Sequence, residues 1–148
     1  MLSGGNKAHL VAFLGFEGAR LLRVLSDDDG HFFTDVTVVF GTPPYQATWD
    51  MHALMANTRL IEQFSPGVRF SGANNPRGAY LLLQEVHRGL DGSPCNRLAV
   101  APFGTKPAAI GSALYCVETD RMRVVYDHPE RKGGRTRGVH RTHWFEIE

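Results

Sequence analysis

Cysteine is scarce in this chain. Two of its 148 residues are cysteines, Cys95 and Cys116, and they form no Cys-x-x-Cys pair. This usage excludes a disulfide framework of the kind that small secreted domains need, and it excludes a zinc site built on cysteine pairs. We therefore expect both cysteines to be free thiols.

Long apolar runs and a strong excess of charge are also missing. No apolar run approaches the roughly 20 residues that a membrane-spanning helix needs. The first residues, Met1 to Lys7, contain no apolar signal-peptide core. We expect a cytoplasmic protein with no membrane partner. The formal net charge of +1 argues against a protein that coats nucleic acid.

The charges that are present are unevenly distributed. An acidic turn, Asp27 to Asp29, lies early in the chain, whereas basic residues gather near its end. The basic residues are Arg121, Arg123, Arg131, Lys132, Arg135, Arg137 and Arg141. The simplest interpretation of these basic residues is that they lie in a solvated surface loop. The alternative is a nucleic-acid contact made by the segment from Arg131 to Arg141.

Metal-binding motifs are absent from the sequence. There is no His-Glu-x-x-His, and the carboxylates form no cluster at ligand spacing other than the acidic turn. Five of the histidines are scattered along the chain: His9, His31, His52, His87 and His128. We expect no bound metal.

What the sequence does contain is an alternation of short apolar runs and amphipathic stretches. Strands are predicted at His9 to Leu14, Thr34 to Phe40, Val68 to Ser71, Arg97 to Ala101 and Met122 to Tyr126. Helices are predicted at Phe16 to Leu25, from a Thr48 cap to Phe64, from Asn74-Asn75-Pro76 to Leu90, and at Lys106 to Val117. The last apolar segment, Arg141 to Ile147, predicts an edge strand, antiparallel to the others.

Strands joined by single helices need right-handed crossovers. The pattern therefore predicts a three-layer, Rossmann-like α/β sandwich, with a mostly parallel sheet of about five strands plus the C-terminal edge strand. A chain of 148 residues fits one such domain, covering residues 1–148.

In a sheet of this kind, ligands bind at the carboxyl ends of the strands. The loops predicted there combine glycine or proline with polar side chains. Their candidate ligand-binding residues are Gly15, Glu17, Arg20, Thr42, Asn74 and Asn75. The alternative interpretation is that these loops are ordinary βα turns, which favour the same residue types.

The strongest chemical signal is the turn Gly104-Thr105-Lys106, between a buried strand and a helix. Backbone N–H groups, a hydroxyl and an ammonium at one point suit an anion such as phosphate. The turn is not a P-loop, and the chain has no Gly-x-Gly-x-x-Gly fingerprint. A motor ATPase or a dehydrogenase is therefore disfavoured, and we expect no cofactor.

This turn and the helix behind it resemble the strand-turn-helix signature of CARF-type domains, the Rossmann-like sensors associated with CRISPR defence. In that signature a Gly-Gly-Thr-Lys-like turn opens a helix beneath a cyclic oligonucleotide. The resemblance covers about a tenth of the chain, and Phe103 replaces the first glycine. Ser3 to Lys7 match the turn more closely but follow no strand here. Either a strand precedes residue 1 in a longer protein, or Gly4 and Gly5 belong to an ordinary terminus.

The resemblance implies a homodimer whose paired turns bind a cyclic oligoadenylate-like ligand. The Gly104 and Thr105 amides and the Thr105 hydroxyl would then hold a phosphate, with Lys106 supplying charge. Glu17 and Arg20 would contact ribose or base edges. The competing interpretation of Glu17 and Arg20 is an i, i+3 pair on the surface of a helix.

His140 and His143 form a second candidate site beside the basic loop. A histidine pair near arginines can supply the acid and the base for phosphodiester cleavage. On a strand, however, the two side chains would point to opposite faces. Three functions follow: a domain that binds a nucleotide or another phosphate ligand, a non-catalytic interaction subunit of a larger complex, and a phosphodiesterase acting on the ligand.

Overall fold

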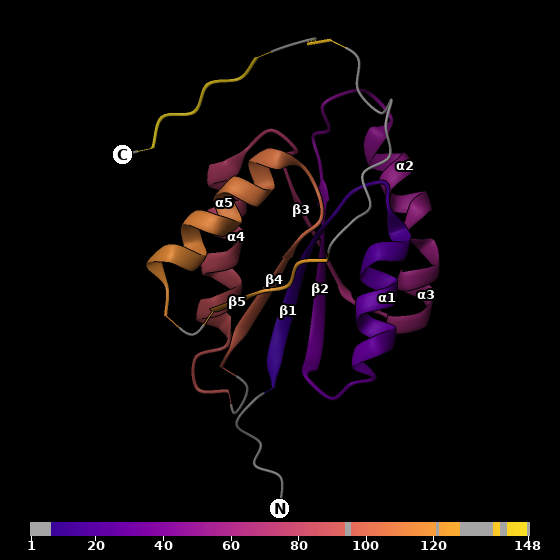
Figure 1. Cartoon of the computed structure of the whole chain (residues 1–148), viewed down its shortest axis with the longest axis vertical. Coiled ribbons are helices and arrows are strands. Elements are labelled where there is room, and N and C mark those ends of the chain that lie inside the picture. The colour runs from indigo at the N-terminus through magenta and orange to yellow at the C-terminus, as the bar shows by residue number, and fades with distance from the viewer. Residues whose placement is uncertain (1–6, 94–95, 121, 128–137, 140–141, 148) are drawn as a thin grey trace, which may run out of the picture.

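The computed structural model describes residues 7–93, 96–120, 122–127, 138–139 and 142–147. Within these residues, strands and helices alternate as the sequence predicts (Figure 1). The strands are β1 (Ala8–Leu14), β2 (Phe33–Gly41), β3 (Gly67–Ser71), β4 (Leu98–Pro102) and β5 (Met122–Val124). The helices are α1 (Gly18–Asp28), α2 (Trp49–Ala56), α3 (Thr58–Phe64), α4 (Pro76–Gly89) and α5 (Lys106–Glu118).

The five strands form one parallel sheet in the order β3-β2-β1-β4-β5. This confirms the predicted Rossmann-like α/β class. β1 lies at the centre, paired with β2 on one side and β4 on the other. From β1 the chain first adds β2 and β3 on one side, and then returns to add β4 and β5 on the other side. The connections after β1 and β4 therefore run in opposite directions, and such a switch point opens a crevice at the carboxyl ends of the strands.

Alternate side chains of β1 pack against the two helical layers. Leu10, Ala12 and Leu14 belong to the core shared with α1, α2 and α3. Val11 and Phe13 belong to the core shared with α4 and α5. Because successive residues of a strand point to opposite faces, a strand covered on both sides must be apolar throughout. Figure 1 shows the two groups of helices on opposite faces of the sheet.

The predicted helix from Thr48 to Phe64 is wrong in one respect, because the structure divides it into α2 and α3 at Asn57. Thr48 occupies the N-cap position, but its φ is 73° and its side chain makes no capping hydrogen bond. The break follows from Asn57, whose buried amide bonds to backbone carbonyls, as asparagine does when it competes with a regular helix.

The predicted C-terminal edge strand is also wrong: residues 142–147 form no strand. β5 pairs with β4 over only three residues, and Asp127, just after it, is bound by Arg20 of α1. That contact fixes Asp127 beside α1, at the carboxyl end of the sheet. The described C-terminal residues lie beyond these ends and not beside β5 (Figure 1). Trp144, expected on the edge strand, is 91% exposed.

None of the described helices is long and apolar enough to cross a membrane.

Candidate functional site

A cleft of about 560 Å³ opens at the carboxyl ends of β1, β2 and β4. Its walls come from the loops that follow these three strands and β3, and from the N-terminal parts of α1 and α2. The lining residues are Leu14, Gly15, Phe16, Glu17, Arg20, Gly41, Pro44, Tyr45, Trp49, Asp50, Ala53, Ala73, Phe103, Gly104 and Thr105. The cleft therefore lies at the switch point, where this topology places ligands, and its volume suits a small organic molecule.

Aromatic side chains dominate the cleft. Phe16 and Trp49 meet edge to face, with ring centroids 5.4 Å apart. Tyr45 and Phe103 add two further rings. Phe16 is 53% exposed, which is unusual for a phenylalanine beside a well-packed core. Exposed aromatic faces in a concave site offer stacking surfaces to a flat ligand.

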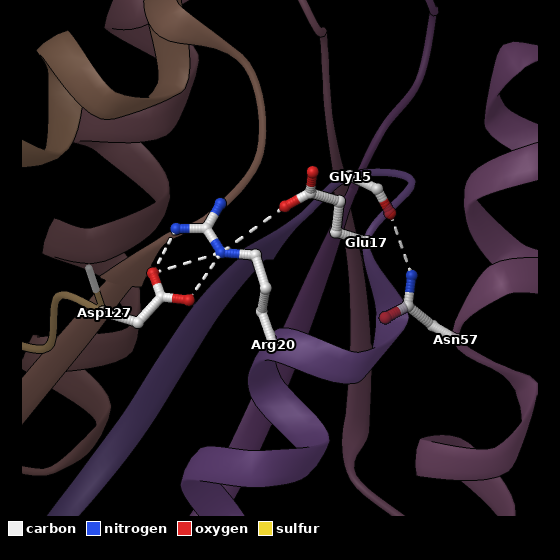
Figure 2. A network of polar contacts seen from close by, with 5 residues as sticks. All are labelled: Gly15, Glu17, Arg20, Asn57 and Asp127. Carbon is white, nitrogen blue, oxygen red and sulfur yellow. Dashed lines mark hydrogen bonds and ion pairs between the residues drawn. The ribbon is translucent and has the colours of Figure 1, made fainter. Parts of the chain in front are cut away.

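Arg20 lines the cleft, but its charge is already paired (Figure 2). Its guanidinium donates to both carboxylate oxygens of Asp127, with Nε 2.8 Å from Oδ2, and it lies 4.3 Å above the Phe103 ring. Glu17 Oε2 is 3.7 Å from Arg20 Nε, so the expected i, i+3 pair exists. The hydrogen bond raises the pKa of Arg20 and lowers the pKa of Asp127. Arg20 therefore ties three strand ends together.

Asn57 holds the β1–α1 loop from the opposite side (Figure 2). Its side chain is 1% exposed and donates to Gly15 O at 3.0 Å and to Ala53 O at 2.7 Å. Its Oδ1 is buried without a hydrogen-bond partner among the described residues. Sequence reasoning missed Asn57. The only signal was an asparagine in the middle of an apparently continuous helix.

Gly15 and Gly104 lie in the cleft because their loops pack closely together. A Cβ on Gly15 would lie 3.3 Å from Phe103 O, and a Cβ on Gly104 would lie 3.2 Å from Leu14 O. Backbone approach between the β1–α1 and β4–α5 loops therefore accounts for both glycines. Both glycines line the cleft, and this packing explains them without a ligand.

Thr105 has a structural role that the sequence did not reveal. Its hydroxyl donates to Ala73 O at 2.6 Å and accepts from Ala108 N at 3.5 Å as the N-cap of α5. The single hydroxyl proton is thus engaged, so Thr105 can offer a phosphate only its backbone N–H while this bond holds. Lys106 is exposed at the start of α5 and does not line the cleft.

Thr42 and Asn75 hold neighbouring loops and do not line the cleft. Thr42 N donates to Ser71 O at 2.9 Å. Asn75 caps α4 by accepting from Gly78 N at 2.8 Å. Of the nine predicted ligand-binding residues, the cleft contains Gly15, Glu17, Arg20, Gly104 and Thr105.

A second chamber, of about 630 Å³, adjoins the first and contains Asn74 and His143. Asn74 Oδ1 accepts from the Tyr45 hydroxyl at 2.9 Å, and Asn74 Nδ2 lies 2.9 Å from His143 Nδ1. The Tyr45 and His143 rings meet at 5.8 Å. His140, the other catalytic candidate, lies outside the described residues, as do residues 131–137 of the basic loop.

The described part of the chain contains no cluster of side chains that could bind a metal ion. It contains no group of three or more metal-ligating His, Cys, Asp or Glu side chains. Asp28 of the acidic turn accepts from Phe32 N and Phe33 N and so shapes the turn before β2. Cys116 is a free thiol whose pKa is raised by burial, and Cys95 lies outside the described residues.

The geometry thus defines an aromatic cleft with two acidic side chains and a paired arginine, beside a polar outer chamber. Comparison with known proteins adds no assignment, since no protein-family model and no curated protein matches this chain.

Proposed function

We propose that this domain binds a nucleoside or nucleotide, with the base against the aromatic walls of the cleft. The observation that supports this most strongly is the position of the cleft. It opens at the switch point of a β3-β2-β1-β4-β5 sheet and is lined by Phe16, Tyr45 and Trp49. Aromatic rings stack on any of the nucleobases, because every base has a flat π face.

The charges of the cleft favour the base and ribose over the phosphate in its interior. Glu17 and Asp50 line it, and the positive charge of Arg20 is paired with Asp127. Carboxylates accept hydrogen bonds from ribose hydroxyls or exocyclic amines but repel a phosphate. The phosphate would lie at the rim formed by Gly104 and Thr105, where α5 begins and Lys106 follows.

The wider role is part of the same proposal. A cyclic-oligonucleotide sensor in prokaryotic defence, cytoplasmic and homodimeric, agrees with the resemblance of the Gly104-Thr105-Lys106 turn to CARF-type domains.

Trp49 offers a direct test. The chain has two tryptophans, so Trp144→Phe leaves Trp49 as the single tryptophan, which can be excited apart from the tyrosines. Titration of this variant with the four nucleosides and their 5′-monophosphates should change Trp49 emission with saturation. Phe16→Ala in the same background should weaken binding about tenfold, because it removes a stacking surface. Phe70→Ala, an exposed phenylalanine of β3 outside the cleft, is the matched control.

Lys106→Ala should weaken binding of monophosphates but not of nucleosides. Unchanged emission with every nucleoside and nucleotide, checked by calorimetry, would show that the proposed function is wrong.

An interaction subunit remains the second candidate, and β3 supports it. This strand pairs with β2 alone among the described strands, and it exposes Val68 and Phe70. An uncovered edge strand can pair with another chain. If no nucleotide binds and Val68→Lys dissociates a complex isolated with the protein, this second function is supported.

A further inference from the structure

The cleft and the outer chamber lie against the same part of the chain. Both are lined by Pro44, Tyr45 and Trp49, from the β2–α2 loop and the start of α2. Each chamber alone, at about 560 and 630 Å³, has the volume of a complete small-molecule site. Two chambers of this size sharing one aromatic wall are more than a mononucleotide would fill.

The outer chamber has a different chemistry from the cleft. Its polar walls are Gln46, Asn74 and His143, with no carboxylate among the described lining residues. Carboxamide side chains can pair with the edge of a purine through one donor and one acceptor. The outer chamber is therefore suited to reading a base edge, whereas the cleft offers aromatic faces and carboxylates.

The hydrogen bonds of Asn74 determine which ring nitrogen of His143 carries the proton. The Tyr45 hydroxyl is bonded to Asn74 Oδ1, so the Asn74 Nδ2 group is the donor to His143 Nδ1. His143 Nδ1 must then accept, which places the proton of the neutral imidazole on Nε2. The three side chains come from the β2–α2 loop, the β3–α4 loop and the C-terminal segment, so they join separate parts of the chain into one wall.

We propose that the outer chamber is a second base-binding subsite, and that the ligand is a dinucleotide or a larger oligonucleotide with adjacent bases in the two chambers. Tyr45 and Trp49 form the wall that both bases share. This inference rests on the proposed function, since it assigns the first base to the cleft.

Calorimetric titration of the full chain with adenosine 5′-monophosphate and with adenylyl-3′,5′-adenosine tests the subsite. The dinucleotide should bind about tenfold or more tightly than the mononucleotide, because the second base binds as a linked group. Gln46→Ala and Asn74→Ala should each remove most of this advantage. Gln63→Ala, an exposed glutamine of α3 outside both chambers, should retain it.

The outcomes separate the two proposals. If the mononucleotide binds and the dinucleotide binds no more tightly, the second subsite is wrong, whereas binding of a single nucleotide in the cleft stands. A Gln46→Ala variant that weakens both ligands equally also overturns the subsite, since Gln46 lines the outer chamber alone. If neither ligand binds, both proposals fail.

Discussion

Single buried polar side chains determine the shape of this site. Asn57 bonds to Gly15 O and Ala53 O, and so holds the β1–α1 loop that forms one wall of the cleft. Its amide group supplies a donor to Gly15 O in that loop and to Ala53 O near the end of α2. A buried acceptor without a donor is costly. The amide of Asn57 therefore connects local helix structure to site geometry.

Asn57→Ala should lower the free energy of unfolding by about 1–3 kcal/mol, because two buried carbonyls lose their donor. Asn57→Asp should cost more at neutral pH, since a carboxylate would face the same carbonyl oxygens. Urea unfolding measures both changes. The exposed Asn96→Ala should stay within about 0.5 kcal/mol of the parent chain. Equal stabilities for Asn57→Ala and Asn96→Ala would contradict this role.

His9 makes the stability of the protein depend on pH. The ring lies partly buried in β1, with Nε2 2.8 Å from Thr37 Oγ1. Burial lowers its pKa from 6.5, although Asp35 opposes the shift. The unfolded chain therefore binds a proton more readily, so the stabilisation is complete above pH 6.5 and is lost as the pH falls toward the lowered folded value.

His9→Gln should reduce the loss of stability between neutral pH and pH 5, because glutamine can hydrogen-bond but does not titrate in this range. Urea unfolding across this range measures the effect. His52→Gln, on the exposed face of α2, serves as the histidine control. An identical pH dependence in the parent chain and His9→Gln would refute the assignment.

At the scale of elements, glycines allow helices to approach closely. Gly111 of α5 faces α4, and a Cβ there would lie 2.1 Å from Pro76 O and 3.0 Å from the Ala79 Cβ. Gly89, at the end of α4, has no atom within 4 Å of the same position. Two helical glycines thus differ only in what surrounds them.

Gly111→Ala should destabilise the protein by about 1–3 kcal/mol, because the methyl group forces α4 and α5 apart. Gly89→Ala should be neutral or stabilising by up to about 1 kcal/mol, since alanine is the better helix former. Chemical denaturation measures both. A stabilising Gly111→Ala would show that the helices are less tightly packed than described.

The Arg20–Asp127 pair joins α1 to the chain after β5. A double-mutant cycle with Arg20→Gln and Asp127→Asn should give a coupling energy of about 0.5–2 kcal/mol, because the contact is two-pronged and partly buried. The exposed Arg69–Glu85 pair, with one contact at 3.1 Å, should give less. Strictly additive effects at Arg20 and Asp127 would contradict this.

The same pair predicts a pH effect. Arg20 lowers the pKa of Asp127 below 3.8. The coupling energy of the Arg20–Asp127 pair should therefore be complete above pH 3.8, and should decline as the pH falls through the lowered pKa that Asp127 has in the folded protein.

At the scale of the whole molecule, the sheet is most protected at its centre. Leu10, Val11 and Ala12 of β1, and Leu98 to Ala101 of β4, are fully buried, whereas most of β3 is exposed. Amide exchange of buried central strands requires the largest opening of the structure.

Hydrogen exchange followed by mass spectrometry should show slowest exchange in β1 and β4 and fast exchange in β3. If β3 pairs with another copy of the chain, as an uncovered edge strand can, protection of that strand should rise with protein concentration. Fast exchange of β1 at all concentrations would contradict the central position of this strand.

Sequence patterns predicted the centre of the sheet well because β1 and β4 are apolar runs covered on both faces. β1 and β4 are uninterrupted, and proline or glycine marks their ends. The division at Asn57 and the missing edge strand escaped prediction. The division at Asn57 depends on a residue far along the chain, because the Asn57 amide bonds to Gly15 O. The apolar residues of the 142–147 segment are mostly exposed, so their pattern did not report burial in the sheet.

The loops at the strand ends, which the sequence singles out, contribute part of the lining of the cleft. Strand-end loops located Gly15, Glu17, Arg20, Gly104 and Thr105 in the cleft. The ring of Trp49 was not expected there, since aromatic residues of a helix usually pack in the core. Its position depends on how α2 meets the carboxyl ends of the strands.

The sequence by itself determined the alternation of elements, and with it the parallel α/β sheet whose strand ends must carry the loops. The tertiary structure alone decided which polar groups those loops can offer to a ligand. Thr105 and Arg20, strong candidates by residue type, are engaged by Ala73 O and Asp127. Periodicity reports burial along one element, whereas hydrogen-bond partners are fixed only when distant segments meet.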